Sequence, residues 1–139
     1  MFLTSSRPIH LARRALLTLA VGLALGSAHA DELSVSLEAA RSALESGRSL
    51  VVDIREPVEH ATGVAAGARL LPMSQLRQRL AEIPNDPAKP VLLICNTQNR
   101  SSRTLKALRE TGGYTNVRYV EGGMREWAKR GWPMVKPER

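Results

Sequence analysis

The sequence has few of the residues that cross-link a chain or bind metal ions. Cys95 is its single cysteine among 139 residues, which excludes an intramolecular disulfide framework. Only three histidines accompany that cysteine, so we expect no Cys/His zinc cage. Aromatic residues make up 4% of the chain, while hydrophobic residues reach 43% and charged residues 24%. This mixture is typical of a globular protein and excludes disorder along the whole chain.

Acidic residues are absent from the first thirty positions, where three arginines precede an apolar run over residues 15–25 and the triplet Ala28-His29-Ala30. A basic start, a short apolar core and a small-x-small site predict a secretory signal peptide over residues 1–30. The run is shorter than the ~20 residues of a stable transmembrane helix. We therefore expect cleavage after Ala30, a periplasmic protein, and no membrane span in the mature chain. Arg13-Arg14 leaves twin-arginine export open beside general secretion.

Residues 31–139 are then expected to form one domain, long enough to bury a core unaided. The whole chain carries 20 Lys and Arg against 13 Asp and Glu, a net charge of +7, and part of this excess lies in the first thirty residues. The remaining excess is mild and typical of a solvated surface, so we expect no nucleic-acid partner.

Short apolar runs alternate with helical patterns along the mature chain. Residues 50–54 and 91–94 are continuous apolar runs, typical of strands buried on both faces. The pattern predicts further strands at 33–35, 69–71 and 117–120, and helices at 36–46, 74–83, 101–111 and 122–130. The alternation favours an α/β domain of three layers, with a mostly parallel sheet of about five strands and helices on both faces.

Cys95 follows the second buried strand directly, at the end of a parallel sheet where ligands bind. Backbone N–H groups of a tight loop, and the helix N-terminus after it, attract anions. Arg100 adds a full positive charge. These features favour the thiolate of Cys95 and predict a nucleophile in an anion-binding loop, although a small buried cysteine is an equal alternative from placement alone. The loop consists of Asn96, Thr97, Gln98, Asn99 and Arg100.

Four motifs, in this order, resemble those of the single-domain rhodanese family, the thiosulfate sulfurtransferases and related persulfide carriers. They are Asp53-Ile54-Arg55-Glu56, Gly63 with Gly67-Ala68, Cys95 with Arg100-Ser101, and Gly122-Gly123 with Trp127 and Gly131-Trp132-Pro133. The resemblance extends from Val35 to Val135. It implies catalytic Cys95, a substrate-binding loop of residues 96–100, and no metal or organic cofactor. The partners it implies are a small sulfur donor and a thiophilic acceptor, such as cyanide or a thiol.

The mechanism that this resemblance implies is a double displacement. Cys95 takes the outer sulfur of thiosulfate or a similar donor, sulfite leaves, and the resulting Cys95 persulfide passes its sulfur to the acceptor. A rhodanese-fold binding module without turnover, or a periplasmic thiol redox protein, is the alternative. Four residues separate Cys95 from Arg100, one fewer than in the Cys-x5-Arg loops of Cys-phosphatases, so we expect no phosphatase activity.

The sequence departs from the family pattern at Gln98, where glycine is usual. If this position were left-handed, a side chain there would cost about 1–2 kcal/mol, so we expect a reshaped or strained loop. Other residues have plainer expectations. Asp53 is expected to bond the turn that follows it, and His60 to lie on the surface. An ion pair with Asp53 or Glu56 is the structural alternative for Arg100.

Overall fold

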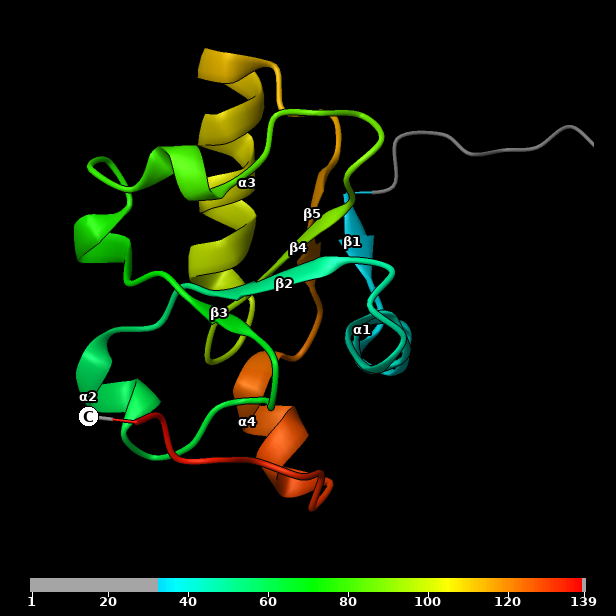
Figure 1. Ribbon diagram of the computed structural model, residues 1–139, viewed down its shortest axis with the longest axis vertical. Helices are drawn as coiled ribbons and strands as arrows, with labels where there is room; N and C mark the ends of the chain where they lie inside the picture. The colour runs from blue at the N-terminus through cyan, green and yellow to red at the C-terminus, as the bar shows by residue number, and fades with distance from the viewer. Residues whose placement is uncertain (1–32, 139) are drawn as a thin grey trace, which may run out of the picture.

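The computed structural model describes residues 33–138 (Figure 1). The signal peptide predicted over residues 1–30 lies outside the described residues. Within them, five strands form one sheet in the order β1-β5-β4-β2-β3, and every neighbouring pair is parallel. The strands are β1 (Ser34–Val35), β2 (Leu50–Asp53), β3 (Arg69–Leu70), β4 (Val91–Ile94) and β5 (Val117–Val120). This sheet confirms the predicted fold class.

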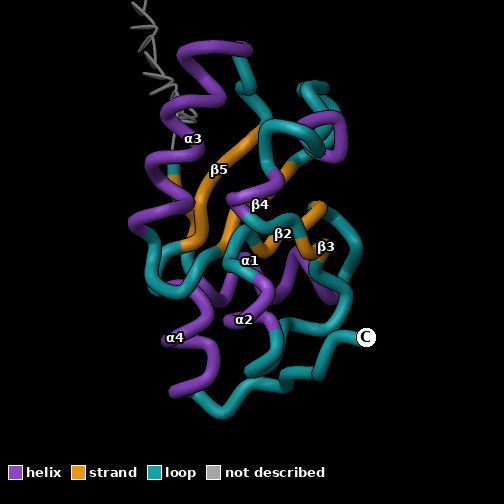
Figure 2. The backbone as a smooth tube through the Cα atoms, turned by 90° about the vertical axis from the view of Figure 1, so that its left-hand side faces the viewer, coloured by secondary structure: helices purple, strands orange, loops and turns teal. Residues whose placement is uncertain are grey.

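Helices cover both faces of the sheet (Figures 1 and 2). One face packs against α1 and α4, and the other against α3 and the two 3-10 helices η1 and η2. The bounds are α1 (Leu37–Glu45), α2 (Pro57–His60), η1 (Met73–Gln75), η2 (Leu80–Glu82), α3 (Asn99–Gly112) and α4 (Gly123–Lys129).

The central strand β4 is buried along its whole length, as its unbroken apolar run predicts. Leu93 faces the α3 side of the sheet, while Leu92 and Ile94 face α1 and α4. Because both faces are packed, β4 holds a fixed position in the middle of the sheet. The carboxyl end of β4 therefore holds Cys95 in a fixed position.

The predicted helix over residues 74–83 is wrong, because two separate 3-10 turns occupy this segment. A helix that begins at Ser74 would use this residue as its N-cap. Instead, its N–H and its hydroxyl both donate to the Glu56 carboxylate, at 2.9 and 2.7 Å. Arg79 further on donates to the Leu70 carbonyl at 3.0 Å. These long-range contacts replace the local hydrogen bonds that a continuous helix requires.

The segment after β2, where the sequence pattern predicted no helix or strand before residue 69, contains the one-turn helix α2. Glu56 and Glu59 form a capping box at its start, and Pro57 occupies its first turn. Both features stabilise a helix N-terminus. This turn matters for the site because it directs Glu59 and His60 back toward the carboxyl end of the sheet.

Candidate active site

Cys95 lies directly after β4 and is 1% exposed. Its Sγ is 3.4 Å from the hydroxyl of Ser101, in the first turn of α3. The same hydroxyl lies 3.1 Å from the Gln98 carbonyl oxygen, to which it can donate. Ser101 is fully buried and was not among the predicted site residues. Its place beside Arg100 in the quoted motif was the signal that could have identified it.

The loop after Cys95 carries backbone donors that no described residue satisfies. Asn99 N–H makes a long contact of 3.4 Å with the Thr97 hydroxyl. The other donors stand at the N-terminus of the 14-residue helix α3, where unsatisfied N–H groups and the helix dipole attract negative charge. Those without a protein acceptor in the described chain are the N–H groups of Asn96, Thr97, Gln98, Arg100 and Ser101.

The N-terminus of α4 holds the loop from the other side. Met124 N–H donates to the Cys95 carbonyl at 2.8 Å, and Arg125 N–H donates to the Asn96 carbonyl at 2.9 Å. The approach is so close that a Cβ on Gly123 would lie 2.3 Å from the Thr97 carbonyl oxygen. Gly123 also has φ of 61°, so a side chain at this position would be strained as well as obstructed. The second glycine of the Gly-Gly motif thus permits the contact between α4 and the loop.

Gln98 does not strain the loop, because its backbone is not left-handed. Its φ is −161°, extended backbone that any residue adopts, and no described non-glycine residue has a positive φ. The Gln98 side chain adds a contact of its own, because its Oε1 accepts a hydrogen bond of 3.1 Å from Gly122 N–H. Gln98 therefore joins the loop to the Gly-Gly turn before α4.

Arg100 is paired with Glu59 of α2, and not with Asp53 or Glu56 as the structural alternative had it. Its two terminal nitrogens donate to the two carboxylate oxygens at 2.7 and 2.6 Å. The hydrogen bonds from Arg100 are the main reason why the pKa of Glu59 falls from 4.5 to about 2. In return the pKa of Arg100 rises, chiefly through Glu59 and also through the nearby Cys95 charge. The ion pair and a position close to Cys95 thus coexist.

Asp53 has the structural role that the sequence predicted. Its carboxylate is fully buried and accepts two bonds from the Arg55 guanidinium group, from Nε at 3.0 Å and from Nη2 at 2.7 Å, together with the Arg55 backbone N–H at 3.0 Å. Arg55 in turn donates to the Gly63 carbonyl at 2.8 Å. The expectation for His60 is wrong, because this side chain is 4% exposed and its Nε2 lies 3.3 Å from Asp53 Oδ1. The turn of α2 folds it inward.

The five predicted substrate-binding residues stay together on the loop. Asn96, Thr97 and Arg100 are half-buried, whereas Gln98 and Asn99 are exposed. Among residues 33–138, no three His, Cys, Asp or Glu side chains gather as a metal-binding group. Nor does this part of the chain contain a helix with the length and apolar character needed to cross a membrane.

A buried thiol at the end of a central parallel strand, loop N–H groups without a protein acceptor and an arginine on the same loop agree with the family comparisons. The chain belongs to the rhodanese family, since the sequence model of the Rhodanese-like domain matches residues 36–130. It is similar to a rhodanese-related protein from Thermoplasma volcanium of known structure, with a TM-score of 0.59 and 29% identity. That match covers 75% of this chain and 98% of the other.

Three curated relatives show how far the similarity extends. A sulfurtransferase of Allochromatium vinosum is 39% identical over 64% of this chain and 80% of its own length. The human thiosulfate:glutathione sulfurtransferase is 31% identical over 70% of this chain and 94% of its own length. An uncharacterised protein of Bacillus subtilis is 41% identical over 58% of this chain and 61% of its own length. Relatives named as sulfurtransferases support a sulfurtransferase-like function.

Proposed function

We propose that this protein transfers sulfane sulfur from thiosulfate, or a similar donor, to a thiophilic acceptor through a persulfide on Cys95. The observation that carries the proposal is the loop after Cys95, whose N–H groups have no protein acceptor and follow a buried thiol. Such donors stabilise negative charge in a site from which water is largely excluded. The similarity to a thiosulfate:glutathione sulfurtransferase supports thiosulfate as donor and a thiol as acceptor.

In the first step, the Cys95 thiolate attacks the outer sulfur of thiosulfate. A sulfur–sulfur bond forms to Cys95, the bond between the two thiosulfate sulfurs breaks, and sulfite leaves with the bonding electron pair. The negative charge is then on the terminal sulfur of the persulfide. Free N–H groups of the loop stabilise this charge, as an oxyanion hole stabilises a developing oxyanion. Arg100 attracts the anionic donor while Glu59 keeps its guanidinium group in place.

In the second step, cyanide or a thiolate attacks the terminal sulfur and the Cys95 thiolate leaves. The hydroxyl of Ser101, 3.4 Å from Sγ, can donate to this thiolate as its charge returns. Both steps are displacements at sulfur that need no external oxidant or reductant. Neither step requires a metal or an organic cofactor. The same groups therefore serve both half-reactions.

The intact mass of the protein after incubation with thiosulfate tests the proposal directly. We expect a gain of one sulfur atom, its removal by cyanide with release of thiocyanate, and neither event in a Cys95→Ala variant. A thiol adduct without a gain of sulfur would instead indicate a redox protein. An unchanged mass would indicate a binding module that has the rhodanese fold without turnover.

The proposal also includes export, with residues 1–30 as a signal peptide and residues 31–139 as the periplasmic domain. The order of basic, apolar and small residues at the start of the sequence supports it. Protein recovered from the periplasm should begin at Asp31 when its N-terminus is sequenced. A full-length cytoplasmic protein as the main species would contradict export and leave the sulfur chemistry untouched.

A further inference from the structure

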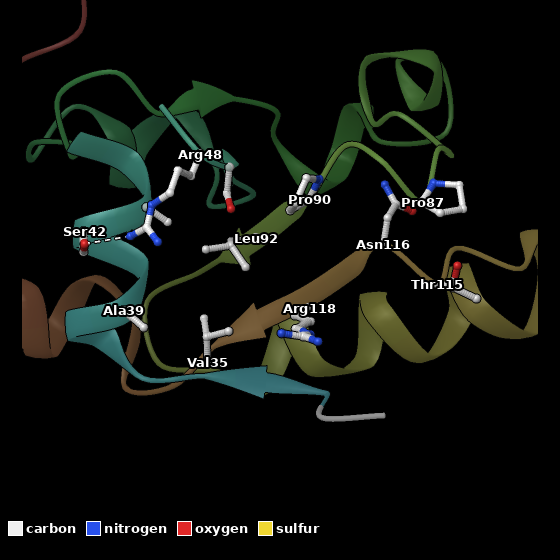
Figure 3. Close-up of a pocket in the computed structure, with 12 residues that line it drawn as sticks. Val35, Ala39, Ser42, Arg48, Pro87, Pro90, Leu92, Thr115, Asn116 and Arg118 are labelled. Carbon is white, nitrogen blue, oxygen red and sulfur yellow. Dashed lines mark hydrogen bonds between the residues drawn. The ribbon is translucent and has the colours of Figure 1, made fainter. Parts of the chain in front are cut away.

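A pocket of about 400 Å³ lies at the amino edge of the sheet, away from the candidate active site (Figure 3). Three of its lining residues, Ser49, Pro90 and Asn116, come directly before β2, β4 and β5. Cys95 follows the opposite, carboxyl end of β4. The pocket is therefore separate from the sulfur chemistry proposed above, and a ligand bound there would not touch Cys95.

Apolar side chains form part of the pocket lining. Leu92 of β4 and Val35 of β1 contribute to it, and Ala39 and Ala43 of α1 form one wall. Leu92 and Arg118 are directly paired in the β4–β5 register, so their side chains leave the sheet on the same face. A charged guanidinium group thus stands beside apolar surface inside one pocket.

Two arginines line this pocket and neither has a carboxylate partner among the described residues. Arg48 donates only to hydroxyl groups, to Ser46 at 2.8 Å and to Ser42 at 2.9 Å, and Figure 3 shows the second of these bonds as a dashed line. Arg118 is half-buried and its side chain makes no hydrogen bond or ion pair with residues 33–138. The lining contains no aspartate or glutamate.

Five arginines elsewhere in the described chain are paired with carboxylates. Each of these binds a carboxylate: Arg41 with Glu45, Arg55 with Asp53, Arg79 with Glu82, Arg100 with Glu59, and Arg130 with Glu38. The two pocket arginines thus concentrate positive charge without a counter-charge from the protein. An anion in the pocket would supply the missing counter-charge.

We propose that this pocket binds a small organic anion, with an acid group held by Arg118, a short hydrocarbon or aromatic part against Leu92 and Val35, and Arg48 adding positive charge to the same pocket. The guanidinium fork matches the geometry of carboxylate, sulfonate and phosphate groups. Hydrocarbon placed against Leu92 and Val35 removes apolar surface from water, which favours binding. The pocket volume of about 400 Å³ falls within the range of small-molecule sites. An inorganic anion would bind the arginines but would leave the apolar residues of the lining uncovered.

The first test uses 4-phenylbutyrate as the probe, titrated into the full chain and followed by methyl NMR. We expect saturable shifts of the Val35, Leu92 and Ala43 methyl signals. The uncharged 4-phenylbutanamide should bind at least tenfold more weakly, because it lacks the acid group. Inorganic sulfate should also bind at least tenfold more weakly, because it lacks the hydrocarbon. Equal binding of the amide would overturn the role of the arginines, and equal binding of sulfate would overturn the organic ligand.

Variants then locate the charge. Arg118→Gln should weaken phenylbutyrate binding about tenfold, the size expected for one charge-assisted contact. Arg48→Gln should weaken it by a smaller factor, about two- to threefold, because it removes a more distant charge. Arg118→Lys keeps the charge without the fork and should recover part of the affinity. Arg77→Gln is the matched control, since it removes the same charge from an exposed residue between η1 and η2 and should leave the affinity unchanged.

Unchanged affinity in both pocket variants, shifts confined to methyl groups elsewhere, or no saturable shift at all would each overturn the proposal. The last outcome includes the case in which the chain's own N-terminal residues occupy the pocket. Sulfur transfer from thiosulfate should be the same in all these variants. This keeps a failure of the pocket distinguishable from a failure of the proposed function.

Discussion

Glu59 and Arg100 are joined by two parallel hydrogen bonds of 2.6 and 2.7 Å, although they are 41 positions apart in the sequence. Glu59 also accepts the Glu56 backbone N–H at 2.9 Å, so one carboxylate fixes both the start of α2 and the arginine of the Cys95 loop. Fork-shaped pairs of this kind fix geometry as well as charge. The helix that follows the first motif thus meets the third motif in a single ion pair.

Glu59→Gln should lower kcat/KM for thiosulfate about tenfold, because Arg100 loses its charged partner and a misplaced group of this kind costs at least that much in rate. Steady-state thiosulfate:cyanide assays measure the effect. Glu82→Gln is the control, since it breaks a comparable pair with Arg79 that lies away from Cys95. Equal rates for Glu59→Gln and the wild type would show that the pair does not position Arg100 for turnover.

The same pair predicts how stability depends on pH. The pKa of Glu59 is about 2 in the folded protein and 4.5 ordinarily, so the folded state favours the charged form. The resulting stabilisation is fully present above pH 4.5 and is lost as the pH falls through 4.5 toward 2. Urea unfolding of the wild type and Glu59→Gln should therefore differ by a constant free energy at neutral pH, and the two should converge in acid. A difference that persists at pH 2 would contradict this assignment.

Cys95→Ser should fold normally and lose all thiosulfate:cyanide transfer. A serine hydroxyl stays protonated at neutral pH and cannot form a persulfide. Circular dichroism and thermal unfolding check the fold, and thiocyanate release checks turnover. Retained activity in this variant would refute the mechanism at its central step.

Arg100→Ala should behave differently, because Arg100 assists the reaction without carrying the sulfur. Removing one well-placed charged donor lowers the rate by about 10²–10³-fold. We expect residual turnover, together with slower alkylation of Cys95 at neutral pH. If alkylation is unchanged and only the melting temperature falls, Arg100 is a structural residue and only its assigned role is lost.

The places of the strands along the chain and the position of Cys95 could be predicted because they depend on local patterns. An unbroken apolar run defines β4, and the thiol after it must lie at the carboxyl edge of a parallel sheet. The partner of Arg100 could not be predicted in this way, because the sequence pattern predicted no helix between residues 54 and 69 and gave Glu59 no position. Glu56-Pro57 followed by Glu59 is a capping-box pattern, and with it the turn could have been recognised.

Two other differences arise from contacts that no local pattern contains. The helix expected over residues 74–83 gives way to bonds from Ser74 to Glu56 and from Arg79 to Leu70. The conformation of Gln98 depends on the contact of α4 with the loop, which is set by backbone groups of Met124 and Arg125. The sequence showed only that Gln98 replaces the glycine usual in the family. That replacement does not produce a strained backbone.

The Gln98 side chain helps to hold the loop after Cys95 against the Gly-Gly turn, and it can be substituted without changing the backbone contacts from α4. Gln98→Met keeps the length of the side chain and removes the acceptor for Gly122 N–H. Loss of one hydrogen bond of this kind is worth about 0.5–1.5 kcal/mol. We expect a two- to tenfold loss of turnover, taking 1.4 kcal/mol as about tenfold, and faster hydrogen exchange at the Gly122 amide.

Gln98→Glu separates the two effects of this side chain. It keeps an acceptor for Gly122, so exchange at that amide should stay slow, but it adds a negative charge next to the loop donors. Attack on an anionic donor should therefore be slower, and the loss should diminish as salt screens the added charge. Wild-type exchange at Gly122 in Gln98→Met would show that the hydrogen bond does not hold the loop. In that case any change in turnover would come from removal of the exposed Gln98 side-chain amide, and not from a looser loop.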